Sequence, residues 1–574
     1  MTISSKIATS NKWSELEHNG VAFPPEYVQR GINIKIFGEI FFLNREQEEM
    51  IYAWAKKKDT HYVKDPVFQS NFLSDFKKLL PDRFSSIQKI DEIDMSEAFN
   101  LVDKELKIKE EEKIRIKLLS REERKRISQG KKIEKEKLKS IYGKAKIDGI
   151  EVDVANWLVE PPGIFMGRGL HPLGGKWKPR VTAQDVILNL GEDASVPEGP
   201  WKAIVHDHYS MWLASWIETL TGKRKYVWLH DSSYLRQDND KSKYDTAKRL
   251  ENYIVAIEKE IINQMLYAKD TTKRKVATVC YLINKLAMRV GDEKDTDEAD
   301  TIGASTLRVE HLKFPNINGK LQIEFNFLGK DSVPWQKTLE ISTPDTKALY
   351  ENLLFFMKGK GSRDEIFEDI TSSKVNNFLR SMDRTNLPNL TAKVFRTHIA
   401  TAIVKRHLTT PILKVNKNEN EFKKVYVAKI ANLQAAITCN HKKGIDPRNP
   451  ASKKSWEKFE QSIANKKEKI KQLKSELKQK EWKTELQKMK KEQRLQKLEF
   501  QIRLQQETRD YNLGTSLRNY IDPRVFKSWC EFVNLDWTRI YTSTLQRKFK
   551  WIEQYSKNDL KKYLNINNKD NNSE

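Results

Sequence analysis

The sequence predicts a multidomain α+β protein that is predominantly helical. The chain has 574 residues, which is too long for a single domain. Apolar residues recur at helical spacing through most of the second half, and strand-like stretches are confined to a few segments. Two long segments, residues 103–140 and 452–509, are dense in charged residues and are expected to form exposed helices.

The composition points to a polyanionic partner. The chain carries 104 Lys and Arg against 79 Asp and Glu, a formal net charge of +25. A positive field of this size attracts nucleic acid first and anionic membrane second. No apolar run is long enough to span a bilayer (Val276–Ile283 is about the longest), and Met1–Ser10 lacks the apolar core of a secretory signal. We therefore expect a soluble intracellular protein with no membrane association.

The cysteine and glycine patterns argue against a disulfide-rich, zinc-binding or nucleotide-binding protein. The three cysteines, Cys280, Cys439 and Cys530, are far apart, so neither a disulfide framework nor a zinc site is expected. The nearest approach to a phosphate-binding loop is Gly175-Lys176, which has Leu170 where the first glycine belongs and Trp177 where Ser or Thr belongs. The Gly167-x-Gly169 pair lies in a Pro-rich loop and is not a dinucleotide fingerprint. Nothing indicates an ATP or NAD site.

The first half of the chain is expected to contain most of the strands. Residues 13–100 form a compact α+β module, with alternating stretches up to Phe42 and helices from Arg45 onward. Residues 103–140 form one long helix or a pair of helices. Residues 150–232 are rich in strands and turns, and Ile204–Trp216 and Tyr226–Leu229 are predicted strands.

The second half alternates between helix and strand before it becomes helical. Residues from Lys243 onward have helical periodicity. Residues 305–342 return to strands, and residues 343–442 are mostly helical again. The three predicted strands are Leu307–Val309, Leu321–Leu328 and Lys337–Ile341.

Residues 452–509 carry a narrow apolar seam on a polar helix, as in a coiled coil. A break near 480–483 permits an antiparallel helical hairpin, and the alternative is one continuous rod. A small helical unit rich in Trp and Phe is expected from Asn512 to Leu564. The polar tail, residues 565–574, is expected to be disordered.

One candidate nucleophile lies near the C-terminus. Tyr520 follows an asparagine and precedes the turn Asp522-Pro523-Arg524. A tyrosine in a basic setting can attack phosphorus and form a covalent intermediate. A tyrosine before a turn is more often structural, so this segment alone is a weak signal.

Four upstream segments place basic residues in unusual settings. Arg289 and His441 each follow an apolar helical segment, Lys330 lies in the turn after an apolar strand, and Arg396 lies inside a helical pattern. Each has an ordinary alternative: Arg289 could pair with Asp292 or Glu293, Lys330 could be a turn lysine, Arg396 could bridge helices, and His441 could cap its helix.

Taken together with Tyr520, these segments resemble the eukaryotic type IB DNA topoisomerases. The resemblance runs from Lys12–His18 to the C-terminal unit. The other matching strings are Glu160–Pro172, Arg289–Lys294, Leu307–His311, Phe327–Ser332, Leu390–Thr397, Cys439–His441 and Asn519–Arg524.

The resemblance implies a role for each catalytic candidate. Tyr520 would attack a DNA phosphodiester and form a 3′-phosphotyrosyl link. Arg289, Arg396 and His441 would hold the non-bridging oxygens, and Lys330 would protonate the departing 5′-oxygen. Phosphoryl transfer depends mainly on positioning and charge stabilisation, for which guanidinium groups are suited. Neither ATP nor a divalent metal is expected to be needed.

The resemblance also implies DNA-binding residues and a drug response. Arg168, Asp331 and Asn519 correspond to positions near the cleavage site where camptothecin-type drugs intercalate, and Lys393 is a further candidate DNA contact. Drug sensitivity is therefore expected. Met166 replaces a usual arginine, and His398-Ile399 replace a usual tyrosine and asparagine, which leaves DNA affinity and drug response less defined.

The implied architecture is a bilobed DNA clamp with a mostly helical catalytic domain, a coiled-coil linker and a small helical C-terminal domain. A monomer acting on double-stranded DNA in the nucleus is expected. With the family's long N-terminal extension reduced to about a dozen residues, import would rely on internal basic runs such as Arg121–Arg126 or Lys131-Lys132. The implied domains are a short N-terminal tail (1–12), cap part I (13–30 and 121–232), cap part II (31–120), the catalytic core (233–442), the linker (443–510) and the tyrosine-bearing domain (511–574).

Two other functions remain compatible with these residues. A site-specific tyrosine recombinase uses a similar Arg-Lys-His-Arg-Tyr set, although the Glu160–Pro172 string and the long linker argue against it. A non-catalytic DNA-binding clamp could keep the fold, although all five catalytic candidates are present.

Overall fold

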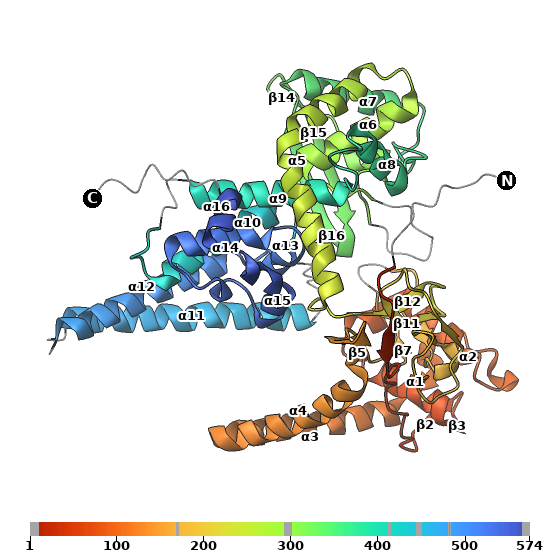
Figure 1. The fold of residues 1–574 in the computed structure, drawn as a ribbon. Coiled ribbons are helices and arrows are strands. Elements are labelled where there is room, and N and C mark those ends of the chain that lie inside the picture. Colours follow the sequence, from red (N-terminus) through yellow and green to blue (C-terminus); the bar gives the residue numbers. More distant parts are fainter. Residues whose placement is uncertain are drawn as a thin grey trace. The chain divides into compact units, whose positions relative to one another are not determined.

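The computed structural model describes residues 11–167, 171–291, 301–410, 415–443, 450–479, 482 and 484–564 (Figure 1). The described chain forms two compact units, one up to Gln237 and the other from Asp238 onward. The predictions for the tail at 565–574 and for the first ten residues of the N-terminal tail lie outside the described residues. The six predicted domains are finer than this division and stay a prediction.

In its described residues, the first unit combines short strands with four α-helices. Its strands are β1 (Leu16–His18), β2 (Asn33–Ile36), β3 (Glu39–Phe42), β4 (Ile93–Asp94), β5 (Lys144–Ile147), β6 (Ile150–Asp153), β7 (Gly163–Ile164), β8 (Trp177–Lys178), β9 (Ile187–Asn189), β10 (Ala203–Val205), β11 (Trp212–Ile217) and β12 (Arg224–Trp228). Its helices are α1 (Arg45–Ala55), α2 (Pro66–Lys77), α3 (Ser96–Leu118) and α4 (Arg121–Tyr142).

Two hydrophobic cores support this unit. One lies between α1, α2 and the sheet β3-β2-β4 and includes Phe72 and Phe76. The other lies against the sheets β1-β5-β6 and β10-β9-β11-β12 and includes Leu16 and Leu188. The compact α+β module predicted for residues 13–100 is therefore confirmed in its element types, although β1 pairs with β5 from beyond it.

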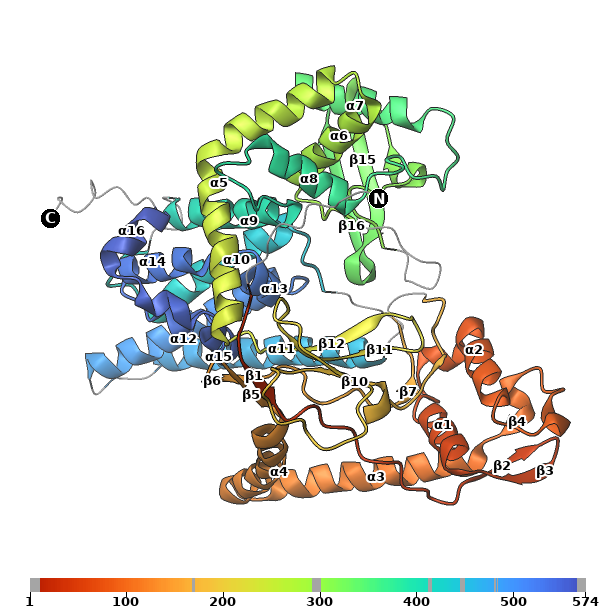
Figure 2. The ribbon, with the colours of Figure 1, turned by 45° about the vertical axis from the view of Figure 1, so that its right-hand side comes forward.

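The charged segment at 103–140 forms a pair of helices, α3 and α4 (Figure 2). The break occurs at Leu119 and Ser120. Ser120 caps α4, because its hydroxyl accepts from the backbone N–H of Glu123 while the Glu123 carboxylate accepts from the N–H of Ser120.

The predicted strand Ile204–Trp216 is wrong as one element. It divides into β10 and β11 around the polar segment 206–211. The amide of Asn189 donates to the carbonyls of Asp207 and Trp212 and accepts from the N–H of Asp207, so a side chain satisfies the backbone groups that a sheet would otherwise pair.

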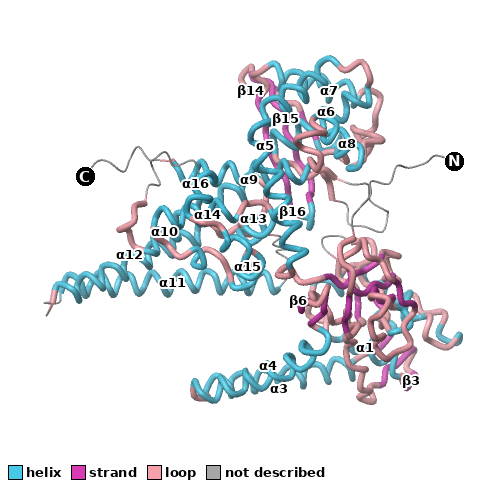
Figure 3. The backbone as a smooth tube through the Cα atoms, viewed as in Figure 1, coloured by secondary structure: helices cyan, strands magenta, loops and turns pink. Residues whose placement is uncertain are grey.

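The second unit, as far as the structure describes it, is mostly helical with one small sheet (Figure 3). Its strands are β13 (Leu312–Lys313), β14 (Asn316–Ile317), β15 (Lys320–Gly329) and β16 (Val333–Glu340). Its helices are α5 (Tyr234–Tyr267, which begins just before the boundary), α6 (Thr271–Leu286), α7 (Pro344–Met357), α8 (Ser372–Met382), α9 (Ala392–Thr409), α10 (Glu421–Thr438), α11 (Pro450–Gln479), α12 (Glu485–Glu507), α13 (Leu513–Asn519), α14 (Pro523–Val533), α15 (Ser543–Lys548) and α16 (Lys557–Leu564).

The hairpin β15–β16 confirms two of the three strands predicted between 305 and 342. The third, Leu307–Val309, is not a strand. The N–H of Arg308 donates to Nδ1 of His311, which caps a 3₁₀ turn at Val309–His311, and the backbone of Arg308 forms an isolated β-bridge with Glu365. A local side-chain bond therefore takes up the backbone N–H that strand pairing would have used, although Arg308 itself keeps an extended conformation.

Two hydrophobic cores also organise the second unit. One packs α6, α7 and α8 against β15. The other joins α9 and α10 to α13, α14, α15 and α16, and it contains the ring of Tyr520. This second core brings the C-terminal helices against α9 and α10, which lie far upstream in the chain.

The helices α11 and α12 pack antiparallel as a hairpin (Figures 1 and 2). Lys474 pairs with Glu499 at 2.9 Å, and Lys491 pairs with Glu476 at 2.7 Å. The hairpin alternative is thus correct, and the continuous rod is wrong. In the described part of the chain, no helix combines the length and the apolar character needed to cross a membrane.

Candidate active site

Tyr520 lies at the junction between α13 and α14. It follows the last residue of α13, and its side chain is buried in the core formed with α9 and α10. Pro523 occupies the first turn of α14, and the Asp522 carboxylate accepts from the N–H of Arg524. An Asp cap followed by Pro is a strong helix start, so the chain turns sharply just after Tyr520.

Two guanidinium groups converge on the hydroxyl of Tyr520. Nη1 of Arg289 donates to the hydroxyl oxygen at 3.1 Å, and Nη1 of Arg396 donates at 2.9 Å. The guanidinium carbon of Arg396 also lies 4.6 Å from the centre of the tyrosine ring. The hydroxyl oxygen therefore sits where two fixed positive charges would stabilise negative charge.

Arg396 is anchored by two backbone carbonyls. It projects from α9 and is 4% exposed. Its Nε donates to the carbonyl of Ala287, and its Nη2 donates to the carbonyl of Cys439, both at 3.0 Å. One side chain thus connects the segment after α6, the segment after α10 and the tyrosine.

His441 lies beside the tyrosine ring. It follows α10 through Asn440, which has φ +53° and turns the chain. The rings of His441 and Tyr520 stack with centroids 5.2 Å apart. Burial, followed by the charges of Arg396 and Arg289, lowers the pKa of His441 to about 3, so the imidazole is neutral at neutral pH. Both ring nitrogens are buried with no hydrogen-bond partner among the described residues.

The charges around the Tyr520 hydroxyl favour the binding of an anion. Burial and the neighbouring charge of Arg396 lower the pKa of Arg289, against the opposing effect of Tyr520. The buried guanidinium of Arg396 and the half-buried guanidinium of Arg289 repel each other, and they lie next to a histidine whose ring nitrogens have no partner among the described residues. A negatively charged oxygen would therefore be favourable to all three groups.

Lys330 lines a pocket that both arginines also line. It begins a 3₁₀ turn, Lys330–Ser332, directly after β15. Its side chain is exposed and lines a pocket together with Arg289, Arg396 and Cys439. The structure therefore brings all five candidates for catalysis into one region of the second unit.

The candidate DNA contacts are placed less completely. Asn519 ends α13 next to Tyr520, and its side-chain amide donates to the carbonyl of Thr515 at 3.2 Å. Lys393 is exposed in the first turn of α9, one turn before Arg396. Asp331 follows Lys330 in its turn, and Arg168 lies outside the described residues.

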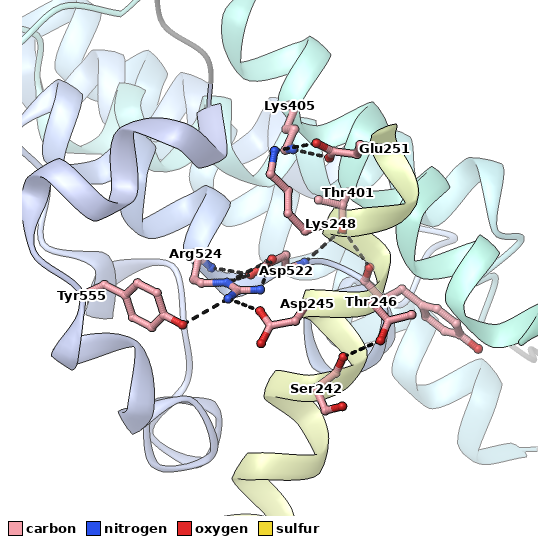
Figure 4. A network of polar contacts seen from close by, with 11 residues as sticks. Ser242, Asp245, Thr246, Lys248, Glu251, Thr401, Lys405, Asp522, Arg524 and Tyr555 are labelled. Atoms are coloured by element: carbon pink, nitrogen blue, oxygen red, sulfur yellow. Dashed lines mark hydrogen bonds and ion pairs between the residues drawn. The ribbon is translucent and has the colours of Figure 1, made fainter. Parts of the chain in front are cut away.

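A polar network that includes Thr401, Asp522 and Arg524 (Figure 4) fixes the backbone around Tyr520. The hydroxyl of Thr401, on α9, donates to the carbonyl of Tyr520 at 3.2 Å and accepts from the N–H of Asp522 at 3.1 Å. Arg524 donates to Asp522 through Nε and Nη2, and to Asp245 on α5 at 2.6 Å through Nη1. The tyrosine's main chain is therefore held to α9 and α5.

The Arg524 side chain is 1% exposed, so its charge depends on these carboxylates. Burial alone would lower the pKa of Arg524, but Asp522 and Asp245 outweigh it and raise the pKa above the ordinary value. In the same region Lys248 and Lys405 both contact Glu251, which ties α9 to α5 a second time (Figure 4).

The sequence did not identify Thr401 or Arg524 as parts of the site. The Asp-Pro-Arg string was a visible signal for Arg524, because a basic residue just inside a helix start lies next to its own capping carboxylate. Thr401 carries no local signal, since its partners are more than a hundred residues away.

Cys280, Cys439 and Cys530 are free and buried. Burial raises the pKa of the Cys280 thiol, which suits an inert core residue. Within the described ranges, no group of three or more His, Cys, Asp or Glu side chains is arranged to hold a metal ion.

Three family models match the chain. Residues 11–229 match the DNA binding fragment of eukaryotic DNA topoisomerase I, and residues 232–477 match its catalytic core. Residues 492–562 match the C-terminal topoisomerase domain. The three matches follow one another in order along nearly the whole chain.

Curated relatives agree with these models. DNA topoisomerase 1 of Caenorhabditis elegans is 35% identical over 94% of this chain and 66% of its own length. DNA topoisomerase 1 beta of Arabidopsis thaliana is 34% identical over 94% of this chain and 58% of its own length. DNA topoisomerase 1 of Homo sapiens is 33% identical over 94% of this chain and 70% of its own length.

The fold is mostly helical, and its candidate site holds a tyrosine buried next to two arginines and a histidine. One family matches this chain along nearly its whole length. The chain belongs to the eukaryotic DNA topoisomerase I family. It spans less than two thirds of the length of the first two relatives.

Proposed function

We propose that this chain is a type IB DNA topoisomerase that relaxes positive and negative supercoils. The observation that carries the proposal is the contact of both Arg289 and Arg396 with the hydroxyl of Tyr520. A phosphate that approached this hydroxyl would meet the same two guanidinium groups.

The proposed cleavage step exchanges one ester for another. The Tyr520 oxygen forms a bond to the phosphorus and loses its proton to solvent, while the bond from phosphorus to the 5′-oxygen breaks. Lys330 supplies the proton that the departing 5′-oxygen needs. Because a phosphodiester becomes a phosphotyrosyl ester, religation is the reverse reaction and requires no ATP.

Arg289, Arg396 and His441 are proposed to hold the non-bridging oxygens. The neutral imidazole of His441 can donate one N–H bond without adding a third fixed charge before DNA binds. The guanidinium groups supply the charge that a metal ion supplies in other phosphoryl-transfer enzymes, so no divalent metal is required in this proposal.

The wider role follows from the family and the charge. We propose that a monomer binds duplex DNA in the nucleus, with the two units as lobes of a clamp and the α11–α12 hairpin as the linker to the tyrosine-bearing helices. Asn519, Lys393, Asp331 and Arg168 would contact DNA near the break, where camptothecin-type drugs would bind. Affinity should be directed at phosphates and fall steeply with salt.

Relaxation of supercoiled plasmid in EDTA without ATP tests the proposal. We expect wild type to relax supercoils of both signs and Tyr520→Phe to relax neither. Tyr267→Phe is the matched control, because Tyr267 is 74% exposed on α5 and should relax DNA like wild type. DNA binding without relaxation by wild type would instead support a non-catalytic clamp, and exchange between specific sites would support a recombinase.

A further inference from the structure

Lys337 lies on the inward-facing side of β16. Along this strand Val333 and Trp335 are buried on the same face, and Lys337 continues the alternation toward the interior. Its ammonium group lies 5.3 Å from the centre of the Trp335 ring. A lysine at such a position needs buried acceptors, because an unpaired ammonium is costly to remove from water.

The acceptors are the terminal carbonyls of two helices. Nζ of Lys337 donates to the carbonyl of Leu286, the last residue of α6, at 2.9 Å. It also donates to the carbonyl of Thr438, the last residue of α10, at 3.1 Å. A cation at the C-terminal end of a helix is favourable because the unpaired carbonyls there carry partial negative charge.

These two helix ends lead directly into the candidate active site. Arg289 lies three residues after Leu286, and His441 lies three residues after Thr438. In each connection one residue adopts a left-handed conformation, Ala287 with φ +52° and Asn440 with φ +53°. Such a conformation costs energy for a residue other than glycine and must be held by its surroundings.

Lys337 and Arg396 bind the same two segments, and in each segment the carbonyls that they bind belong to neighbouring residues. Lys337 binds the carbonyls of Leu286 and Thr438, and Arg396 binds those of Ala287 and Cys439. The strand adds a third link, because the side-chain amide of Asn440 donates to the carbonyl of Pro334 at 3.1 Å. The β15–β16 hairpin thus binds the ends of both helices through Lys337, and it binds the segment after α10 a second time through the carbonyl of Pro334.

We propose that Lys337 is a positioning residue of the reaction: by joining the ends of α6 and α10, it sets the distance between Arg289 and His441 around the Tyr520 hydroxyl. This inference rests on the proposed function. Lys337 acts through the two segments and not on the phosphate. A misplacement of about 1 Å in such a site can slow chemistry roughly 100-fold while leaving binding nearly intact.

Single-turnover formation of the covalent DNA adduct tests this role. The substrate is a labelled duplex whose short downstream strand dissociates after cleavage, and the adduct is separated on a denaturing gel. We expect Lys337→Met to slow adduct formation about 10- to 100-fold with duplex affinity within about twofold of wild type. Lys337→Arg keeps a cation with several donors and should recover most of the rate. Lys320→Met is the control, because Lys320 lies on β15 of the same hairpin with an exposed side chain paired to Glu340.

The outcomes separate the two proposals. No adduct with wild type would overturn the proposed function, and the inference with it. Adduct formation by wild type with an equal rate for folded Lys337→Met would overturn the inference alone, even if that variant melted at a lower temperature. If Lys337→Met does not fold, Lys337→Gln replaces it: a rate well below that of Lys337→Arg supports the inference, and an equal rate overturns it.

Discussion

The guanidinium of Arg396 donates to the hydroxyl of Tyr520 over 2.9 Å, although 124 residues separate the two in the sequence. The same guanidinium binds the carbonyls of Ala287 and Cys439. Arg396 therefore fills two roles at once: it points a positive charge at the candidate nucleophile, and it holds the backbone segments that carry Arg289 and His441.

Arg396→Lys should separate charge from geometry. Lysine keeps the positive charge but cannot make the three bonds that the planar guanidinium makes in this position. We expect relaxation activity to fall by about 100-fold or more, as for loss of a transition-state donor, and the melting temperature to fall by several degrees. Initial relaxation rates and calorimetry measure the two effects. Activity near that of wild type would show that charge alone suffices.

Thr401→Val should loosen the main chain at Tyr520. Valine has a similar shape but leaves the buried N–H of Asp522 without its acceptor, at a cost of about 1–3 kcal/mol in the free energy of unfolding. Thr401→Ser keeps the hydroxyl and should stay close to wild type. Urea unfolding curves of the three proteins check this. Equal destabilisation by both variants would assign the effect to lost packing instead.

Arg524→Met should be among the most destabilising single changes in the second unit. It leaves the carboxylate of Asp522, which is 5% exposed, without its buried partner, and breaking such a pair costs about 3–5 kcal/mol. Arg539→Met is the matched control, because Arg539 pairs with Glu421 at the surface, where an ion pair contributes about 0–1 kcal/mol. Denaturant unfolding of both variants provides the comparison, and similar losses would contradict the expectation.

His441 should make stability depend on pH in the acid range. Its pKa is about 3 in the folded protein, against about 6.5 in an unfolded chain. Between these values the unfolded state binds a proton that the folded state does not, so this histidine makes stability fall as pH decreases from about 6.5 toward 3. Above about 6.5 its contribution is constant.

The comparison of wild type with His441→Gln isolates this effect. Glutamine does not titrate, so the free energy of unfolding of the variant should change less steeply over this range, by up to about 1.4 kcal/mol per pH unit. Chemical unfolding at several pH values measures the difference. Parallel curves for the two proteins would mean that His441 is protonated as readily in the folded state as in the unfolded chain.

Much of the fold was predictable where it depends on local sequence patterns. The paired helices α3 and α4 and the seam of α11 and α12 follow from periodicity and capping residues such as Ser120. The failures at Ile204–Trp216 and Leu307–Val309 have one cause: a side chain, Asn189 in the first case and His311 in the second, takes up backbone groups that strand pairing would have used. Neither interaction is visible in a hydrophobic pattern.

The sequence by itself determined the family, the candidate nucleophile Tyr520 and its four basic companions, because residue type and order along the chain carry that information. Only the tertiary structure decided how they meet: that Arg289 and Arg396 reach the same oxygen, that His441 is neutral beside it, and that Thr401 and Lys337 hold the segments in place. The physical reason is that these bonds join groups far apart in sequence, whose distance is set by core packing and not by local conformational preference.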